Sequence, residues 1–307
     1  MATTRTATRQ RPARSGRPPA RRPPARSGRP PARRKPPRRQ ERGGSGRALL
    51  LVVLLVGVGV WLWHTRPEQG PSVLAGTCAV RGSDLTVTTE QAANAATIAA
   101  VARTRGLPPR ATVIALATAQ QESRLRNLDY GDRDSLGLFQ QRPSQGWGSE
   151  AQVQDPVYAA GKFYDGLVRV PGWEISRLTE VAQRVQRSGF PEAYQQWETM
   201  AVTLTGALYS TEAGALACAP STAGGGDPAA VAAAATAQLG VPATVGPDGV
   251  VEVDAAAGRP GGTWAVAQAE RLGLTRVTAD GWRWTPADGW TPAPGTALAP
   301  LRFEVAG

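Results

Sequence analysis

The sequence predicts a mainly α-helical protein in which a helical domain follows a disordered basic tail and one transmembrane helix and precedes a small α+β module. Three observations predict this fold class. Alanine-rich segments without Gly or Pro occur between residues 85 and 218, an uncharged apolar run occupies residues 48–63, and a weak helix–hairpin repeat follows residue 228. The expected divisions are a tail at 1–47, a transmembrane helix at 48–65, a linker at 66–84, the helical domain at 85–218, a linker at 219–227 and the module at 228–307.

The tail carries the excess positive charge of the chain. Residues 1–47 hold 16 of the 35 Lys and Arg and one acidic residue, whereas the remaining 260 residues hold 19 basic and 23 acidic side chains. The sequence PARSGRPPARR occurs at 12–22 and again at 24–34. With almost no apolar side chains the tail cannot offset its chain entropy, so we expect it to be disordered. We expect no nucleic-acid binding, because no aromatic side chains are interleaved with the charge.

The apolar run at 48–63 predicts a membrane anchor. It is uncharged and ends in Trp61 and Trp63, which suit a membrane interface, although it is shorter than the ~20 residues that usually span hydrocarbon. A signal-peptide core is the alternative, but the basic region before it is long and no clean cleavage site follows at once. The charge excess therefore predicts a single-pass protein of the cell membrane, with its N-terminus inside and its C-terminal domains extracytoplasmic.

The helical domain is expected to begin with a helix at 89–105, where Thr88 and Gln91 have the spacing of a capping box. Further helices are expected at 111–125, 157–170, 175–187 and 192–216, and no strand is expected before Cys218. The two cysteines, Cys78 and Cys218, flank this domain. They predict a disulfide if it lies outside the cytoplasm, and two unpaired thiols are the alternative.

One helix of this domain carries a carboxylate among aliphatic side chains. Steps of four, four and three residues from Ile114 lead through Thr118 and Glu122 to Leu125, so these residues share one stripe. A partly desolvated Glu has a raised pKa and can give a proton to a leaving-group oxygen, as cleavage of a glycosidic bond requires. For Glu122 taken alone, a solvated residue in the last turn is the alternative reading.

The residues around Glu122 resemble the lytic transglycosylase branch of the lysozyme-like superfamily. Those enzymes carry Glu-Ser at a helix end and a Gly-Leu-Met-Gln type of motif after a loop, and this chain has Glu122-Ser123 and then Gly137-Leu138-Phe139-Gln140. Residues 182–186 and 188–194, with Trp197, resemble the closing helices of lysozyme-like domains in actinobacterial and phage cell-wall proteins. The resemblance covers roughly residues 85–217. It departs from the family late in the domain, where the Tyr-Asn pair of many members is not obvious and the nearest candidates are Tyr158, Tyr164 and Tyr194.

The resemblance implies cleavage of the β-1,4 bond between N-acetylmuramic acid and N-acetylglucosamine in peptidoglycan, without a cofactor. By position, Glu122 would donate a proton and then take one from the C6 hydroxyl of the substrate, which gives a 1,6-anhydro sugar. Ser123 and Gln140 would position the substrate. The remaining expected substrate-binding residues are Gly137, Phe139, Trp147 and Tyr194, although Trp147 could instead serve packing.

The loop between Asn127 and Ser135 holds three aspartates, Asp129, Asp132 and Asp134. One of them could be the second carboxylate of a hydrolytic pair, or all three could be solvated turn residues. Calcium does not fit, because the twelfth position counted from Asp129 is Gln140. The chain has a single His, His64, so we expect no metal site.

A weak repeat follows the second cysteine. Residues 230–252 and 265–284 each contain an Ala-rich segment, Leu-Gly, a short apolar run, Asp-Gly and a second short run. Asp-Gly between short runs predicts a hairpin. Trp282, Trp284 and Trp290 could bind wall polymer, or they could fill a small core.

The expected function is therefore cleavage of peptidoglycan by a membrane-anchored lytic transglycosylase. Three alternatives stay open. The protein could be a lysozyme-type muramidase, a non-catalytic peptidoglycan-binding or scaffold protein, or a component of a conjugation or secretion assembly with envelope proteins as partners.

Overall fold

The computed structural model describes residues 52–58, 73–190, 192–222, 225–296 and 299–305. The chain divides into two units, Met1–Arg66 and Pro67–Gly307, and each is described by itself. Residues 52–58 of the first unit are helical. The predicted tail at 1–47 lies outside the described residues, as do the other residues of the predicted span at 48–65.

The described helices do not agree with the prediction of a membrane anchor. Among the described residues, no helix is both long enough and apolar enough to cross a membrane. A span needs ~20 apolar residues. Within the described residues, the prediction of a transmembrane helix at 48–65, and with it that of a single-pass membrane protein, is therefore wrong.

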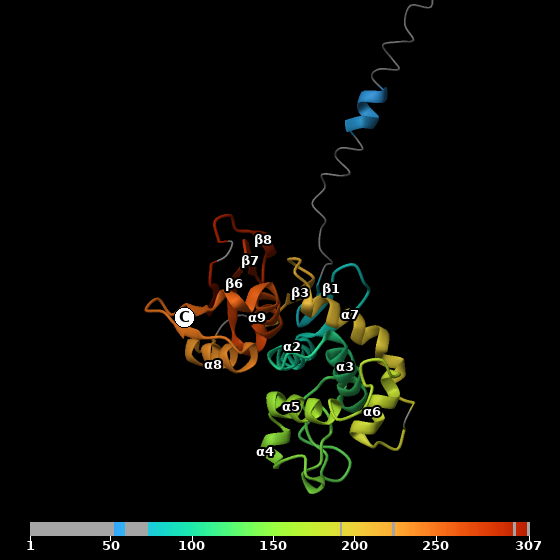
Figure 1. Ribbon diagram of the computed structural model, residues 1–307. Coiled ribbons are helices and arrows are strands. Elements are labelled where there is room, and N and C mark those ends of the chain that lie inside the picture. Colours follow the sequence, from blue (N-terminus) through green and yellow to red (C-terminus); the bar gives the residue numbers. More distant parts are fainter. Residues whose placement is uncertain (1–51, 59–72, 191, 223–224, 297–298, 306–307) are drawn as a thin grey trace, which may run out of the picture. The chain divides into compact units, whose positions relative to one another are not determined.

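The helices of the second unit are arranged around α2 (Figure 1). Helix α2, Thr89–Thr104, contacts α3, α5 and α7 on one side, and its many buried alanines let these helices approach closely. The predicted capping box is present, because Thr88 Oγ1 accepts from Gln91 N–H at 3.2 Å and Gln91 Oε1 accepts from Thr88 N–H at 2.9 Å. The other helices of this region are α3 Pro109–Ser123, α4 Glu150–Val153, α5 Pro156–Leu167, α6 Leu178–Gln186 and α7 Glu198–Tyr209, with 3-10 turns η1 Pro143–Gln145 and η2 Gln195–Trp197.

The prediction of a mainly α fold is wrong, because the described chain contains two antiparallel sheets. The first joins the two ends of the helical region in the order β2-β1-β3, with β1 Thr77–Val80, β2 Thr86–Thr88 and β3 Leu216–Ala219. None of these strands was expected. They have three or four residues each, too few for alternation of apolar and polar side chains to stand out in the sequence.

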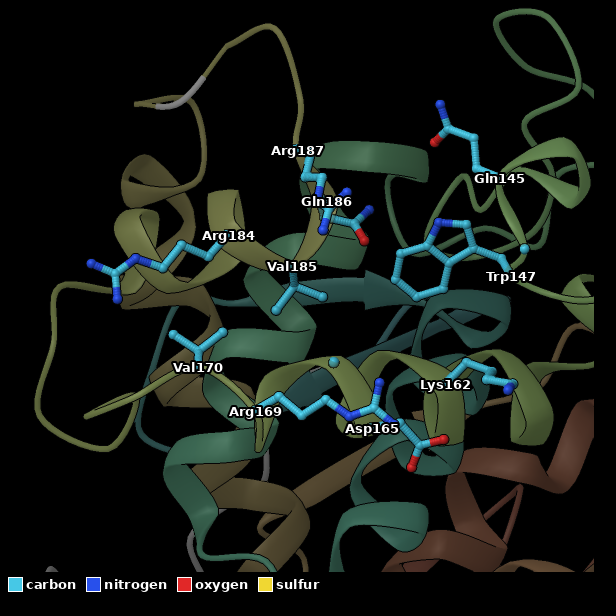
Figure 2. A pocket seen from close by; sticks show the side chains of 12 residues that line it. Gln145, Trp147, Lys162, Asp165, Arg169, Val170, Arg184, Val185, Gln186 and Arg187 are labelled. Atoms are coloured by element: carbon cyan, nitrogen blue, oxygen red, sulfur yellow. The ribbon is translucent and has the colours of Figure 1, made fainter.

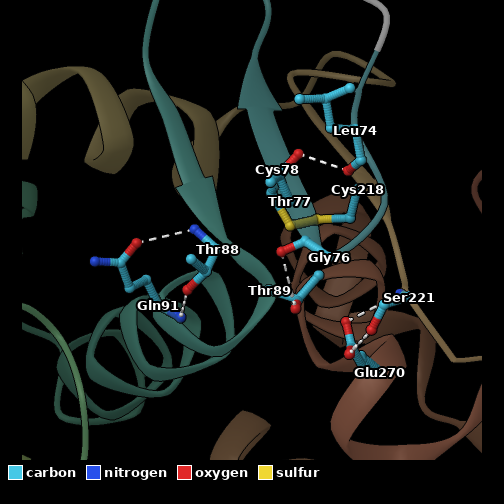
Figure 3. Close-up of a disulfide and its surroundings, with 10 residues drawn as sticks. All are labelled: Leu74, Gly76, Thr77, Cys78, Thr88, Thr89, Gln91, Cys218, Ser221 and Glu270. Atoms are coloured by element: carbon cyan, nitrogen blue, oxygen red, sulfur yellow. Dashed lines mark hydrogen bonds between the residues drawn. A yellow bond between two sulfur atoms is a disulfide. The ribbon is translucent and has the colours of Figure 1, made fainter.

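The predicted disulfide is present and lies inside this sheet (Figure 3). Cys78 on β1 is directly opposite Cys218 on β3, and the bond joins residues 140 positions apart. Both cysteines are buried. The covalent link therefore fastens the start of the helical region to its end.

The second sheet belongs to the C-terminal part of the chain. Its order is β4-β5-β9-β6-β7-β8, and all its pairs are antiparallel. The helix–hairpin repeat predicted from the sequence is present, with α8 before one hairpin and α9 before the other. The elements are α8 Pro228–Leu239, β4 Ala243–Val245, β5 Val251–Val253, η3 Ala255–Ala257, α9 Gly258–Leu272, β6 Leu274–Ala279, β7 Trp282–Thr285, β8 Gly289–Pro292 and β9 Leu301–Val305.

The Asp-Gly pairs occupy the turns of these hairpins. In the tighter one, Ala279 is paired with Trp282, so Asp280 and Gly281 alone form the loop. Both have positive φ, 48° and 80°, as a type I′ turn requires. Of the three tryptophans considered for polymer binding, Trp284 is fully buried, while Trp282 and Trp290 are half-buried.

Helix α9 packs on α2, on the side away from α3 (Figure 1). Buried polar contacts hold this junction. Gln268 Nε2 of α9 donates to Ala93 O and to Thr97 Oγ1 of α2, both at 3.0 Å, and Gln238 of α8 accepts from Thr97 at 2.9 Å. Residues of the helical region and of the C-terminal part also share one hydrophobic core.

Candidate active site

Glu122 lies in the last turn of α3 and is only partly buried. Helix α3 starts at Pro109, which needs no N–H partner at this position, and it stops at a tight reversal where Arg124 and Leu125 both have positive φ, 58° and 57°. Burial raises the pKa of the Glu122 carboxyl above its usual value, although hydrogen bonds from Tyr194 and Gln186 act in the opposite direction. The carboxyl therefore keeps its proton to higher pH than an ordinary Glu.

Two side chains of α2 fix the reversal behind Glu122. Gln91 Nε2 donates to the carbonyl oxygen of Arg124 at 2.9 Å, and the buried Asn94 Nδ2 donates to that of Leu125 at 2.8 Å. Arg271 of α9 in turn donates to Asn94 Oδ1 at 2.6 Å. The end of α3, and with it Glu122, is thus held through α2 by the C-terminal part of the chain.

Tyr194 holds one oxygen of the carboxyl. Its hydroxyl donates to Glu122 Oε1 at 2.7 Å, and its side chain is buried. Burial first, and the nearby negative charge of Glu122 second, raise the pKa of Tyr194 far above its ordinary value. The phenol therefore stays protonated and acts as a donor. The predicted site residue Tyr194 lies directly beside Glu122.

Gln186 is the site residue that the sequence did not single out. It ends α6, its Nε2 donates to the carbonyl oxygen of Phe139 at 2.7 Å, and it also forms a hydrogen bond with Glu122. Gln186 thereby connects α6, the Gly-Leu-Phe-Gln motif and the carboxyl. The available signal was its place in the 182–186 segment that carried part of the family resemblance.

The motif after the loop is held from within the protein. Ser123 is buried, and its hydroxyl lies 2.7 Å from the carbonyl oxygen of Leu138 and 3.0 Å from that of Ala119. Phe139 is fully buried and stacks on Phe163 with ring centroids 4.7 Å apart. These contacts link the end of α3 to the motif, and they leave neither side chain facing solvent.

Gly137 and Gln140 shape the backbone of the same motif. Gly137 has φ 75°, and a Cβ there would lie 2.2 Å from the carbonyl oxygen of Val153, so only glycine fits. Gln140 Nε2 donates to the carbonyl oxygen of Tyr130 at 3.2 Å, and its side chain covers Gly131, where a Cβ would lie 2.0 Å from Gln140 Oε1. Gly137 therefore lets the motif pass close to α4, and Gln140 closes the polar loop onto the motif.

Of the three loop aspartates, one is held by residues that follow the motif and two are exposed. Asp134 accepts from Ser144 N–H and from Arg142 Nε, both at 2.7 Å. The hydrogen bonds from Ser144, followed by that from Arg142, hold the pKa of Asp134 well below its usual range. Asp129 and Asp132 are exposed. In the described part of the chain, no side-chain hydrogen bond joins any of the three to Glu122.

A cleft of about 710 Å³ opens beside this constellation (Figure 2). Glu122 is not one of its lining residues, and Gln186 connects the cleft to the carboxyl. Figure 2 shows Gln186 and Val185 on one wall, with Trp147 and Gln145 facing them. Trp147 is half-buried and packs against the core, so part of its ring serves packing and part lines the cleft.

The described residues contain no group of three or more His, Cys, Asp or Glu side chains that could hold a metal ion. No protein-family model and no curated protein matches this chain.

Proposed function

We propose that this protein cleaves the glycan strand of peptidoglycan between N-acetylmuramic acid and N-acetylglucosamine as a lytic transglycosylase. The observation that carries the proposal is the environment of Glu122, a partly exposed carboxyl with a raised pKa, fixed by Tyr194 and connected through Gln186 to a large cleft. A carboxyl that keeps its proton to higher pH than an ordinary Glu can act as a general acid.

In the first step Glu122 gives its proton to the glycosidic oxygen. The bond from C1 to that oxygen breaks, and the bonding electrons leave with the oxygen, so positive charge develops at C1. In the second step the C6 hydroxyl of the same sugar attacks C1, while the Glu122 carboxylate takes the hydroxyl proton. The bond between O6 and C1 closes a 1,6-anhydro ring, and the carboxyl regains its proton. No water is consumed.

Tyr194 has a defined part in this cycle. Because its hydroxyl donates to Glu122 Oε1, it stabilises the carboxylate that exists between the two steps. It also limits the orientations open to the carboxyl. Gln186 supports the charged form in the same direction.

The state of the loop aspartates favours this reaction over hydrolysis by a carboxylate pair. Such a pair needs a second carboxylate placed across the scissile bond as nucleophile or base. Asp134 is engaged by Arg142 and Ser144, and Asp129 and Asp132 are exposed with no side-chain hydrogen bond to the Glu122 constellation among the described residues. A single Glu acting twice requires no such partner.

The test is digestion of purified peptidoglycan by the full chain, with the products separated and weighed by mass spectrometry. We expect anhydromuropeptides from the wild type and a rate lower by roughly 10²–10⁴-fold from Glu122→Gln. Glu174→Gln is the matched control, because Glu174 is exposed and should cut at the wild-type rate. Products with reducing ends would replace the proposal with hydrolysis. Release of no products by the folded wild type would replace it with a binding role.

A further inference from the structure

The cleft beside Glu122 carries an excess of positive charge. Its lining includes four basic side chains, Lys162, Arg169, Arg184 and Arg187, and one acidic side chain, Asp165. They come from α5, from the residues after it and from the end of α6, so two separate elements bring their charges to one hollow (Figure 2).

Most of this charge is uncompensated within the described residues. Asp165 forms an ion pair with Arg105, outside the cleft lining, and is therefore already neutralised. Lys162 lies over the ring of Tyr158 at 5.5 Å, a contact that leaves its charge in place. Arg169, Arg184 and Arg187 are exposed, and none of the three forms an ion pair with another described residue.

We propose that this cleft binds the carboxylates of the peptide that peptidoglycan carries on muramic acid, an inference that rests on the proposed function. The N-acetylated sugars of the strand are neutral, so a neutral polysaccharide gives these arginines no partner. The peptide is attached to the sugar whose bond would be cut at Glu122, and Gln186 borders both the carboxyl and the cleft. An acidic peptide that leaves the strand at this sugar would enter the cleft.

The size and chemistry of the cleft agree with such a ligand. A volume of about 710 Å³ lies within the range of pockets for small ligands, and it holds more than a single ion. Guanidinium groups bind carboxylates through two parallel hydrogen bonds, which favours arginine at a site of this kind. Trp147 and Val185 provide apolar surface between the charges, against which aliphatic peptide atoms can pack.

The test measures binding without cleavage, so its outcome is separate from that of the proposed reaction. Full-length Glu122→Gln protein is titrated by calorimetry with two probes, the disaccharide bearing L-Ala-D-Glu with both Glu carboxylates free, and the same disaccharide with its lactyl carboxyl amidated and no peptide. We expect the acidic probe to bind about tenfold more tightly or better, with a preference that falls as salt rises.

Two double variants, each made in the Glu122→Gln protein, show which arginines cause the preference for the acidic probe. Arg169→Gln with Arg187→Gln should remove the preference and leave binding of the neutral probe unchanged. Arg81→Gln with Arg283→Gln removes two exposed charges outside the cleft lining and should keep the preference. Equal affinity for the two probes, or a preference that survives loss of Arg169 and Arg187, would overturn the inference. Tighter binding of a glycerol phosphate oligomer than of the acidic probe would also overturn it, in favour of a phosphate polymer.

Discussion

Glu122 is placed where two physical effects oppose each other. Partial burial disfavours its charged form, while the Tyr194 and Gln186 hydrogen bonds favour that form, and burial is the larger effect. A proton donor that must later act as a base needs both influences. A fully buried carboxyl would hold its proton too firmly, and a solvated one would lose it below neutral pH.

Replacement of Tyr194 by Phe separates these effects. Because the lost hydrogen bond stabilises the carboxylate, we expect the pKa of Glu122 to rise further, and the alkaline limb of the pH–rate profile to move to higher pH. The maximal rate should fall roughly 10–100-fold, since the carboxyl is also less well oriented. The control is Tyr209→Phe, whose hydroxyl contacts Thr112 at 2.8 Å and should leave the alkaline limb unchanged. A limb that moves to lower pH would refute this role of Tyr194.

The raised pKa of Glu122 also has a consequence for stability. A carboxyl with a raised folded-state pKa contributes stability that is fully present below its ordinary value, near 4.5, and is lost as pH rises through the folded-state value. Glu122→Gln should therefore unfold like the wild type at acidic pH. Above the folded-state pKa of Glu122 it should be more stable than the wild type, because the buried carboxylate then carries its charge and the amide does not. Urea unfolding across pH, with Glu174→Gln as control, measures the difference, and a constant offset between the two proteins would contradict the raised pKa.

At the scale of elements, the junction between α3 and the motif depends on one buried hydroxyl. Ser123→Ala removes the donor to the carbonyl oxygen of Leu138, and we expect the free energy of unfolding to fall by about 1–3 kcal/mol. Thr203→Ala is the control, because Thr203 makes a similar bond to Thr199 on an exposed face and should change stability by less than about 0.5 kcal/mol. If Ser123→Ala instead raised KM without loss of stability, Ser123 would have the substrate-positioning role that the family resemblance implies.

The elements that could be predicted from the sequence are those whose signals are local. The capping box at Thr88, the proline at the start of α3 and the Asp-Gly hairpin at Asp280 each depend on a few neighbouring residues, and all three are present. Strands β1 and β3 depend on each other across 140 residues, and nothing in either short segment specifies that pairing. The prediction of a mainly α fold was wrong for this reason.

The candidate site likewise contains residues with a local signal and residues whose roles depend on distant partners. Glu122 is a candidate from the sequence because a carboxylate among aliphatic residues is unusual within a single helix, and its catalytic role stays a prediction. Gln186 and Asn94 were not found, because their roles depend on partners from other elements, Phe139 and Glu122 for the first and Leu125 and Arg271 for the second. In retrospect, Asn94 was the lone amide within the alanine-rich part of α2, a pattern that indicates a buried hydrogen bond.

At the scale of the whole molecule, the disulfide holds together the unit that positions Glu122. Its loop is long, so the chain-entropy model gives a large effect, and replacement of both Cys78 and Cys218 by Ala should lower the free energy of unfolding by about 2–5 kcal/mol. Urea unfolding of the double variant and of wild type, each with and without dithiothreitol, checks this. The reductant should bring the wild type to the level of the variant and leave the variant unchanged. If the wild type and the double variant were equally stable without dithiothreitol, the short sheet alone would hold the two ends of the helical region together.

The most direct test of the central claim, that Glu122 acts alone as acid and then as base, is digestion of peptidoglycan by the full chain in water enriched in oxygen-18. Closure of the ring by the C6 hydroxyl consumes no water, so we expect anhydro products without heavy oxygen, formed roughly 10²–10⁴-fold more slowly by Glu122→Gln. Incorporation of one heavy oxygen at each new reducing end, trapped at once by borohydride reduction, would contradict the claim and establish hydrolysis.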